Sequence, residues 1–163
     1  MRSMPLSLFA LCSGALVSAC AAKYSEPEET QPSAELHIVS STSGIAASSW
    51  FDGYASEACE EKDGGRLATF NLVTKADRIV RIAAGSRFYV LAGAHITPPV
   101  GAEVRKESCR SMMSFVPEAG RTYEIKQDLE TRNCPITIKD AATGTAVSTA
   151  EKHRVRDLCK EKV

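Results

Sequence analysis

The sequence predicts an all-β fold, a small antiparallel β-sandwich of about seven or eight strands with one short C-terminal helix. Short runs rich in Val, Ile, Thr, Tyr and Phe alternate apolar with polar residues, recur about every ten residues, and are separated by turn residues. Near the C-terminus the apolar residues fall instead at helical spacing. After an N-terminal targeting segment and a tether, about 130 residues remain, which suits one domain with a single core.

The expected strands are segments in which successive side chains point to opposite faces. Residues 40–65 break this pattern, because they are rich in Ser, Gly, Ala and acidic residues. We expect a long loop there, or a short helix over residues 54–62. The strands are expected over residues 35–39, 66–73, 77–83, 87–91, 109–116, 122–127, 135–139 and 146–148.

A short amphipathic helix is expected over residues 149–160. Ser148 and Glu151 have the spacing of a capping box, in which each side chain bonds a backbone N–H of the other residue. Val155, Leu158 and Cys159 then follow at positions i, i+3 and i+4, which lie on one face of a helix.

Residues 1–19 have the features of an export signal. Arg2 precedes an apolar run over residues 6–17, which is 12 residues long and too short to span a bilayer. The run ends in Leu-Val-Ser-Ala-Cys at Cys20, an ending that resembles the lipobox of bacterial lipoproteins. The resemblance implies cleavage before Cys20 and attachment of diacylglycerol and palmitate to this residue. An ordinary secretory signal, cut near Ala19 or Ala22, is the alternative.

The residues after Cys20 bear on where the mature chain resides. Ala21 and Ala22 follow Cys20 where an Asp would signal retention, which resembles the default for transfer to the outer membrane in Gram-negative bacteria. We therefore expect a lipid anchor in the cell envelope, at the outer membrane. Residues 20–34 are polar and acidic, so we expect a disordered tether spanning about 20 Å, followed by one domain over residues 35–163.

The charge of the chain is balanced, with 20 Lys and Arg against 20 Asp and Glu. Removal of the signal peptide takes away only Arg2, so the net charge of the mature chain stays close to neutral. A nucleic-acid partner needs a clustered basic face, so we expect none.

The cysteines support the lipobox interpretation. Cys12 leaves with the signal peptide, and lipidation of Cys20 would leave four thiols, an even number. The envelope permits disulfides, and three pairings of the four thiols are open. We favour Cys109–Cys134, because both residues begin expected strands, together with Cys59–Cys159. A zinc site is the competing reading, but the smallest of these cysteine spacings, from Cys109 to Cys134, is far longer than a zinc knuckle.

A weak internal repeat aligns residues 82–90 with residues 116–125. Each copy has a strand, Ala-Gly, two polar residues and a strand with an aromatic residue, which we interpret as a β-hairpin turning at Gly85 or Gly120. This pattern resembles the small transthyretin-like or PEGA-like β-sandwich modules of bacterial envelope proteins. The resemblance covers residues 66–140 and bears on the fold rather than on an activity.

Candidate catalytic and metal-binding residues are sparse. His37, His95 and His153 are far apart in the sequence, and no Gly-x-Ser-x-Gly elbow or phosphate-binding loop occurs. We expect no catalytic residue, no metal and no cofactor apart from the covalent lipid. An enzyme would require Asp52 to converge in space with His37 or His95.

Two segments are candidate binding regions. Trp50 and Tyr54 lie close to Asp52 and Glu57, and aromatic and acidic residues together can form a carbohydrate site, although Trp50 could equally fill the core edge. The apolar stretch over residues 91–104 is the second, with His95 and Ile96 at its centre, and it could form a loop tip that contacts a partner.

Three functions remain open from the sequence. The first is a non-enzymatic, membrane-anchored envelope lipoprotein with a structural or protein-binding role, whose envelope protein partner is unknown. The second is a ligand-binding or inhibitor module for a glycan, a small molecule or an enzyme. The third is an enzyme built on the residues named above.

Overall fold

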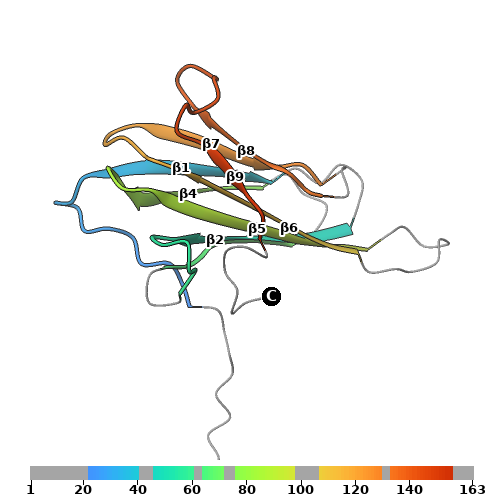
Figure 1. Ribbon diagram of the computed structural model, residues 1–163. Coiled ribbons are helices and arrows are strands. Elements are labelled where there is room, and N and C mark those ends of the chain that lie inside the picture. The colour runs from blue at the N-terminus through green and yellow to red at the C-terminus, as the bar shows by residue number, and fades with distance from the viewer. Residues whose placement is uncertain are drawn as a thin grey trace, which may run out of the picture.

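The computed structural model describes residues 22–40, 46–60, 64–71, 76–97, 107–129 and 133–155. These residues form nine β-strands in two sheets, and no helix lies among them (Figure 1). The expected all-β class is therefore confirmed. The strands are β1 (Ser33–Ser40), β2 (Ala46–Tyr54), β3 (Gly64–Asn71), β4 (Ala76–Ala83), β5 (Phe88–Thr97), β6 (Glu107–Phe115), β7 (Thr122–Gln127), β8 (Ile136–Asp140) and β9 (Glu151–His153).

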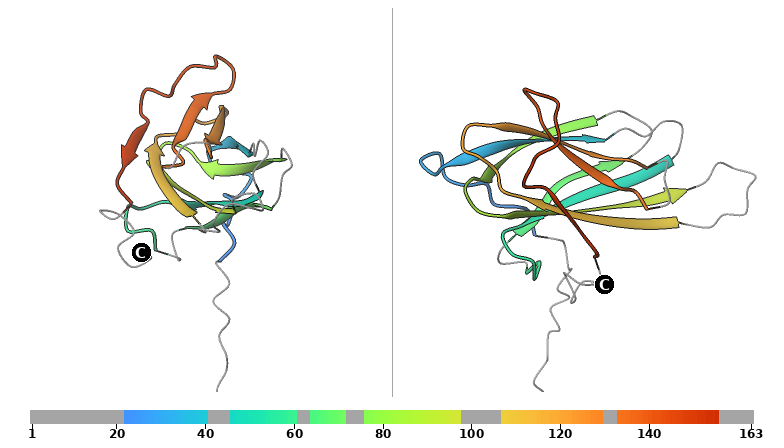
Figure 2. Two further views of the ribbon diagram at one scale, coloured as in Figure 1. Left: turned by 90° about the vertical axis from the view of Figure 1, so that its right-hand side faces the viewer. Right: turned by 45° about the horizontal axis from the view of Figure 1, so that its top comes forward.

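The two sheets stack as separate layers (Figures 1 and 2). The four-stranded sheet has the order β4-β1-β7-β8, and the five-stranded sheet has the order β3-β2-β5-β6-β9. Neighbouring strands pair antiparallel except β1 and β7, which run parallel with Leu36 opposite Tyr123. This pair corrects the expectation of a purely antiparallel sandwich. The two strands are far apart in the chain, so no hairpin turn forces them to run in opposite directions.

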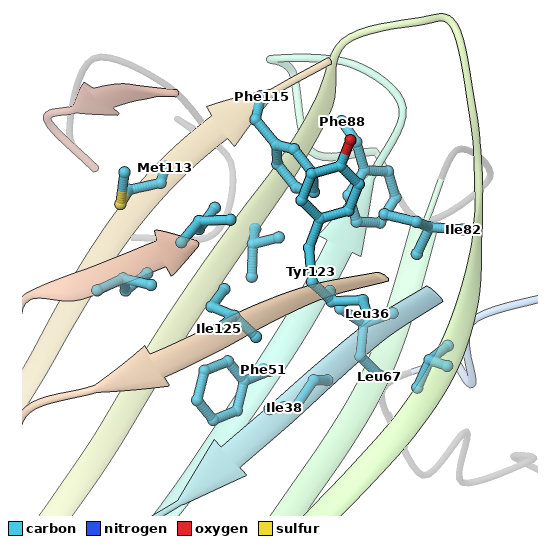
Figure 3. Packing of buried hydrophobic residues seen from close by; sticks show 14 of the residues in the cluster. Leu36, Ile38, Phe51, Leu67, Ile82, Phe88, Met113, Phe115, Tyr123 and Ile125 are labelled. Carbon is cyan, nitrogen blue, oxygen red and sulfur yellow. The ribbon is translucent and has the colours of Figure 1, made fainter. Parts of the chain in front are cut away.

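A single large core fills the space between the sheets (Figure 3). The rings of Phe115 and Tyr123, one from each sheet, meet edge to face with centroids 5.0 Å apart, and Phe88 packs on Phe115 in the same manner. Burial of each such side chain contributes roughly 1.5–3 kcal/mol. The core is built from apolar residues of eight strands, including Leu36, Ile38, Phe51, Leu67, Val80, Ile82, Phe88, Val90, Met113, Phe115, Tyr123, Ile125, Ile136 and Ile138.

The internal repeat has a different structural meaning from the one expected. Gly85 and Gly120 both have positive φ, at 84° and 75°, so a turn does occur at each. Neither turn joins a hairpin, because β4 and β5 belong to different sheets, as do β6 and β7. The repeated unit is a crossover between sheets. The N–H of Gly85 donates to the carbonyl of Pro117 at 2.8 Å, so the two crossovers lie side by side.

Strand β2 occupies part of the segment in which a loop or a helix was expected. It lies between β3 and β5, and its inward positions include Phe51 and Gly53. A Cβ on Gly53 would lie 2.5 Å from the Phe88 ring and 3.0 Å from Leu67, so a small residue is required there. Small residues have low strand propensity, and this is why the strand was missed.

The expected C-terminal helix is wrong within the described residues. Glu151–His153 form β9, which pairs antiparallel with Met112–Ser114 of β6. The Ser114 hydroxyl hydrogen-bonds Nε2 of His153 at 2.7 Å, and Arg87 forms an ion pair with Glu151 at 2.9 Å. Pairing with the edge of β6 therefore outweighs the local helical pattern. The expected strand over residues 146–148 is reduced to one bridge between Ala146 and Lys139.

Residues 22–32, which we call the N-terminal strap, lie against the domain instead of leading away from it. The N–H of Arg66 in β3 donates to the carbonyl of Ala22 at 2.7 Å, and the N–H of Tyr24 donates to the carbonyl of Arg66 at 3.1 Å. The Tyr24 ring packs edge to face on Phe88, and burial raises the pKa of its hydroxyl. Arg81 of β4 donates to the carbonyl of Pro27 at 2.8 Å. The strap therefore joins the edge strands β3 and β4 of the two sheets.

One of the two favoured disulfides is confirmed. Cys109 and Cys134 are bonded, with their Cα atoms 5.9 Å apart, and they link β6 to the residues before β8. Cys59 is also disulfide-bonded. The pairing Cys59–Cys159 stays a prediction, because Cys159 lies outside the described residues, as do Cys12, Cys20 and the whole of the expected signal peptide. Val155, four positions before Cys159, packs against the buried cluster that contains Cys59.

Removal of the Cys109–Cys134 bond is expected to lower the stability of the domain. The bond closes a loop with a sequence separation of 25 residues. The double variant Cys109→Ala/Cys134→Ala should lose about 3–4 kcal/mol of unfolding free energy, because its unfolded chain is less restricted. Urea unfolding without reductant measures this loss. An unchanged free energy of unfolding would show that the bond contributes nothing to stability.

Asp140, at the end of β8, is expected to make the stability depend on acidic pH. Its carboxylate accepts hydrogen bonds from Arg121 at 2.8 Å and from the N–H groups of Ala142 and Thr143 at 3.0 Å each. The Arg121 hydrogen bond, followed by that of the Thr143 N–H, holds the pKa of Asp140 below its usual value. This stabilisation is present above the unfolded pKa of about 3.9 and is lost as the pH falls through the lower folded pKa.

Asp140→Asn should therefore lower the melting temperature at pH 7, and the difference from the parent chain should shrink as the pH falls below about 4. Circular dichroism melts over this pH range measure the difference. Glu124→Gln on the neighbouring strand β7 is the control. A difference that stays constant with pH would contradict the assigned role of the carboxylate.

Candidate functional site

The outer face of the five-stranded sheet carries the residues singled out from the sequence. Because Phe51 points into the core, its neighbour Trp50 points outward. The strand register places Trp50 in a row that crosses four strands, with a second row beside it. The first row is Thr69, Trp50, Gly93 and Arg110, and the second is Asn71, Ser48, His95 and Ser108. We call these eight residues the outer rows.

Trp50 lies at the centre of the outer rows. Its indole covers Gly93, where a Cβ would collide with the ring. The His95 ring lies against the indole, with centroids 4.9 Å apart. The Arg66 guanidinium is 6.0 Å from the indole centroid, and its Nε donates to the Asp52 carboxylate at 2.5 Å. The sequence candidates Trp50 and His95 are thus brought together, with polar groups around them.

The other sequence candidates, Tyr54 and Ile96, are not brought together with Trp50 and His95. Tyr54 is on the same face but is only 2% exposed, because it packs in a buried cluster with Cys59, Leu91 and Met112. Tyr54 therefore offers no surface to a ligand. Ile96 pairs through its backbone with Ala47 and Glu107, and its side chain lies outside the described residues, as does most of the expected loop tip over residues 98–104.

A groove of about 840 Å³ adjoins the outer rows. It lies between β6 and β9 of one sheet and the start of β8 in the other, and Ser108 and Arg110 belong to both the groove and the outer rows. Lys152 and Arg154 also line it. On its other wall the Ser111 hydroxyl donates to the Asn133 carbonyl at 2.7 Å, next to the Cys109–Cys134 disulfide.

The residues of the groove were missed from the sequence. Lys152 and Arg154 fall in the expected helix, where charged side chains are expected to face water. Arg110 falls in the strand expected over residues 109–116, where a single charged residue does not indicate a binding site. Only the pairing of β6 with β9 and the disulfide bring these residues together, and neither the register nor the strand order can be read from local patterns.

Of the three residues named for an enzyme, Asp52 and His95 share a face and His37 does not. His37 lies on the outer face of the four-stranded sheet, where its Nε2 is 3.1 Å from the Asp77 carboxylate. Asp52 and His95 are on the outer face of the other sheet, and the Asp52 carboxylate bonds Arg66. Ser114 contacts His153, but the serine is fully buried and fixes β9 to β6.

The described residues offer neither a metal site nor a membrane-spanning helix. In this part of the chain no group of three His, Cys, Asp or Glu side chains could hold a metal ion. Within the same ranges, no helix has the length and apolar character to cross a bilayer.

No protein-family model, no curated protein and no solved structure matches this chain.

Substitution of Gly93 is expected to displace Trp50. In Gly93→Ala the new Cβ would overlap the indole, so the ring must leave its position over β5. Trp50 is the single tryptophan of the chain, so its emission reports this site alone. We expect a red shift of the emission maximum and a loss of about 1–3 kcal/mol of stability. Ser108→Ala, on the same face, is the control, and an unshifted maximum in Gly93→Ala would contradict the packing.

Proposed function

We propose that this chain is a membrane-anchored lipoprotein of the bacterial cell envelope, lipidated on Cys20, whose domain binds a partner protein without catalysing a reaction. The observation that carries the binding role is the continuous surface formed by the outer rows and the groove. It combines one aromatic side chain, exposed polar groups and three basic side chains, Arg110, Lys152 and Arg154. Interfaces are enriched in Trp and Arg, which supports a binding role for this surface.

The strap gives the proposed anchor a definite geometry. Its contacts with β3 begin at Ala22, two positions after Cys20. Two residues span at most about 7 Å, compared with about 20 Å for a free tether over residues 20–34. A lipid on Cys20 would therefore hold the domain directly at the membrane surface, with the beginning of β3 next to the headgroups. Two or more acyl chains give stable anchoring, whereas one holds only marginally.

A second candidate function is ligand binding at the outer rows. The observation that favours it is the Trp50 indole beside His95, with the Arg66–Asp52 ion pair adjacent. An aromatic ring next to charged hydrogen-bonding groups can stack on a sugar and bond its hydroxyls. Titration of soluble envelope glycans against Trp50 fluorescence tests this function. Saturable quenching that Trp50→Phe weakens would favour it over the protein-binding role.

The lipid anchor is tested by substitution of its cysteine. Cys20→Ser should abolish incorporation of labelled palmitate and release the chain from the membrane fraction, because no thiol remains to accept the lipid. Mass spectrometry should show that the Cys109–Cys134 bond persists, since Cys20 takes no part in it. Cys12→Ser, in the expected signal peptide, is the matched control and should leave both properties unchanged. Membrane retention of the Cys20→Ser chain would refute the anchor, and loss of folding would make Cys20 a disulfide partner.

A further inference from the structure

The groove between β6, β8 and β9 is elongated. Its wall on β6 runs from Ser108 to Met113, about 17 Å at the usual rise of a strand. Residues of the other sheet, Pro135 and Ile136, form the opposite wall. A channel of this length suits an extended chain better than a compact small molecule.

The groove is basic. Lys152 and Arg154 are exposed, and within the described ranges neither of them forms an ion pair, whereas Arg66, Arg81, Arg87 and Arg121 each do. Arg110 adds a third positive charge at the rim. None of the described side chains that line the groove is acidic. Lys152 and Arg154 are two positive charges without an ion-pair partner among the described residues, and on a concave surface such charges attract a ligand of the opposite sign.

Apolar atoms share the lining with these charges. Pro135 on one side of the groove and Val155 on the other are half-buried, so both leave apolar surface exposed. A free phosphate or another small anion would leave this apolar surface unused. A polypeptide with both acidic and apolar side chains would cover it, because successive side chains of an extended chain point to opposite sides.

The position of the groove separates it from the proposed anchor. The strap joins β3 at one edge of the five-stranded sheet, and the groove lies beside β9 at the other edge. Four strand spacings of about 4.8 Å put roughly 19 Å between the two edges. A domain held at the membrane by its β3 edge would present the groove away from the headgroups. The geometry therefore favours a protein over an anionic lipid as the occupant.

We propose that the groove binds an extended, acidic segment of a partner polypeptide. Carboxylates of the segment would pair with Lys152 and Arg154, and its apolar side chains would cover Pro135 and Val155. This inference rests on the protein-binding role proposed above and names the chemistry of the partner. Only the preference for a protein over a lipid uses the anchor. The charges and the apolar lining of the groove do not depend on lipidation, so failure of the anchor and failure of the groove are separate results.

The test uses the full chain in detergent micelles and a fluorescein-labelled eight-residue peptide of alternating Glu and Val. We expect saturable binding in an anisotropy titration, weakened by added salt, and reduced deuterium exchange over residues 107–115. The same peptide with Lys in place of Glu should bind at least about tenfold more weakly, since like charges would then face one another. Equal binding of the two peptides, or no binding of the acidic one at millimolar concentration, would overturn the proposal.

Charge reversal assigns the binding to the groove. Lys152→Glu/Arg154→Glu should weaken binding of the Glu-Val peptide about tenfold or more and should improve binding of the Lys-Val peptide. Lys126→Glu/Lys139→Glu, which reverses two exposed charges on the four-stranded sheet, is the matched control and should change both affinities less than about twofold.

If circular dichroism shows that the double Glu variant is unfolded, Lys152→Gln/Arg154→Gln replaces it, and the Glu-Val peptide should still bind severalfold more weakly. Unchanged affinity in a folded groove variant would refute the site. Binding to phosphatidylglycerol vesicles, a second kind of polyanion, is measured as well. The Cys20→Ser chain is used for this measurement so that a lipid on Cys20 cannot attach the chain to the vesicles. Vesicle binding that requires Lys152 and Arg154, without binding of the Glu-Val peptide, would identify a lipid surface instead and overturn the proposal.

Discussion

The edges of the two sheets are the constraint on which the rest of this structure depends. An edge strand presents backbone N–H and C=O groups that need partners, and an uncovered edge invites aggregation. At one edge the strap hydrogen-bonds both the backbone N–H and the backbone C=O of Arg66. Its Pro27 carbonyl also accepts a hydrogen bond from the Arg81 side chain of the other sheet. At the other edge the short strand β9 covers part of β6. The strap thus covers part of the first edge and connects the two layers there, whereas the second edge leaves a groove between them.

This asymmetry connects packing with the proposed function. The strap brings the N-terminal end of the described chain to the β3 edge, so a lipid placed two residues earlier would fix the domain by that edge. The basic groove and the outer rows extend toward the opposite edge, where a partner in the envelope could reach them. The proposed anchor and the groove thus lie at opposite edges of the five-stranded sheet, and the anchored domain would present the groove away from the membrane.

The sequence predicts the strands in which apolar and polar residues alternate cleanly. It fails where contacts between residues far apart in the chain determine the structure. Residues 122–127 were expected as a strand and form β7, because Tyr123 and Ile125 alternate with polar residues. Strand β2 was missed because its composition resembles that of a loop. One of its residues, Gly53, must be small because the Phe88 ring packs against it. β9 was expected as a helix, because pairing with β6 involves residues about 40 positions away and overrides local propensity. In the candidate site, the sequence identifies Trp50 and His95 as candidate binding residues. It does not identify the basic residues Lys152, Arg154 and Arg110, because only the order of the strands makes them neighbours.

Depth measurements on the anchored chain test directly whether the domain sits on the membrane by its β3 edge with the groove pointing away. Nitroxide labels at Ala55→Cys, close to the strap, and at Ser108→Cys, in the groove, would be compared in vesicles by power saturation. We expect lipid-soluble oxygen to relax the label at position 55 more strongly, and a water-soluble nickel complex to relax the label at position 108 more strongly; this is the result of the proposed orientation. Equal exposure of both labels to lipid, or a deeper label at position 108, would contradict it.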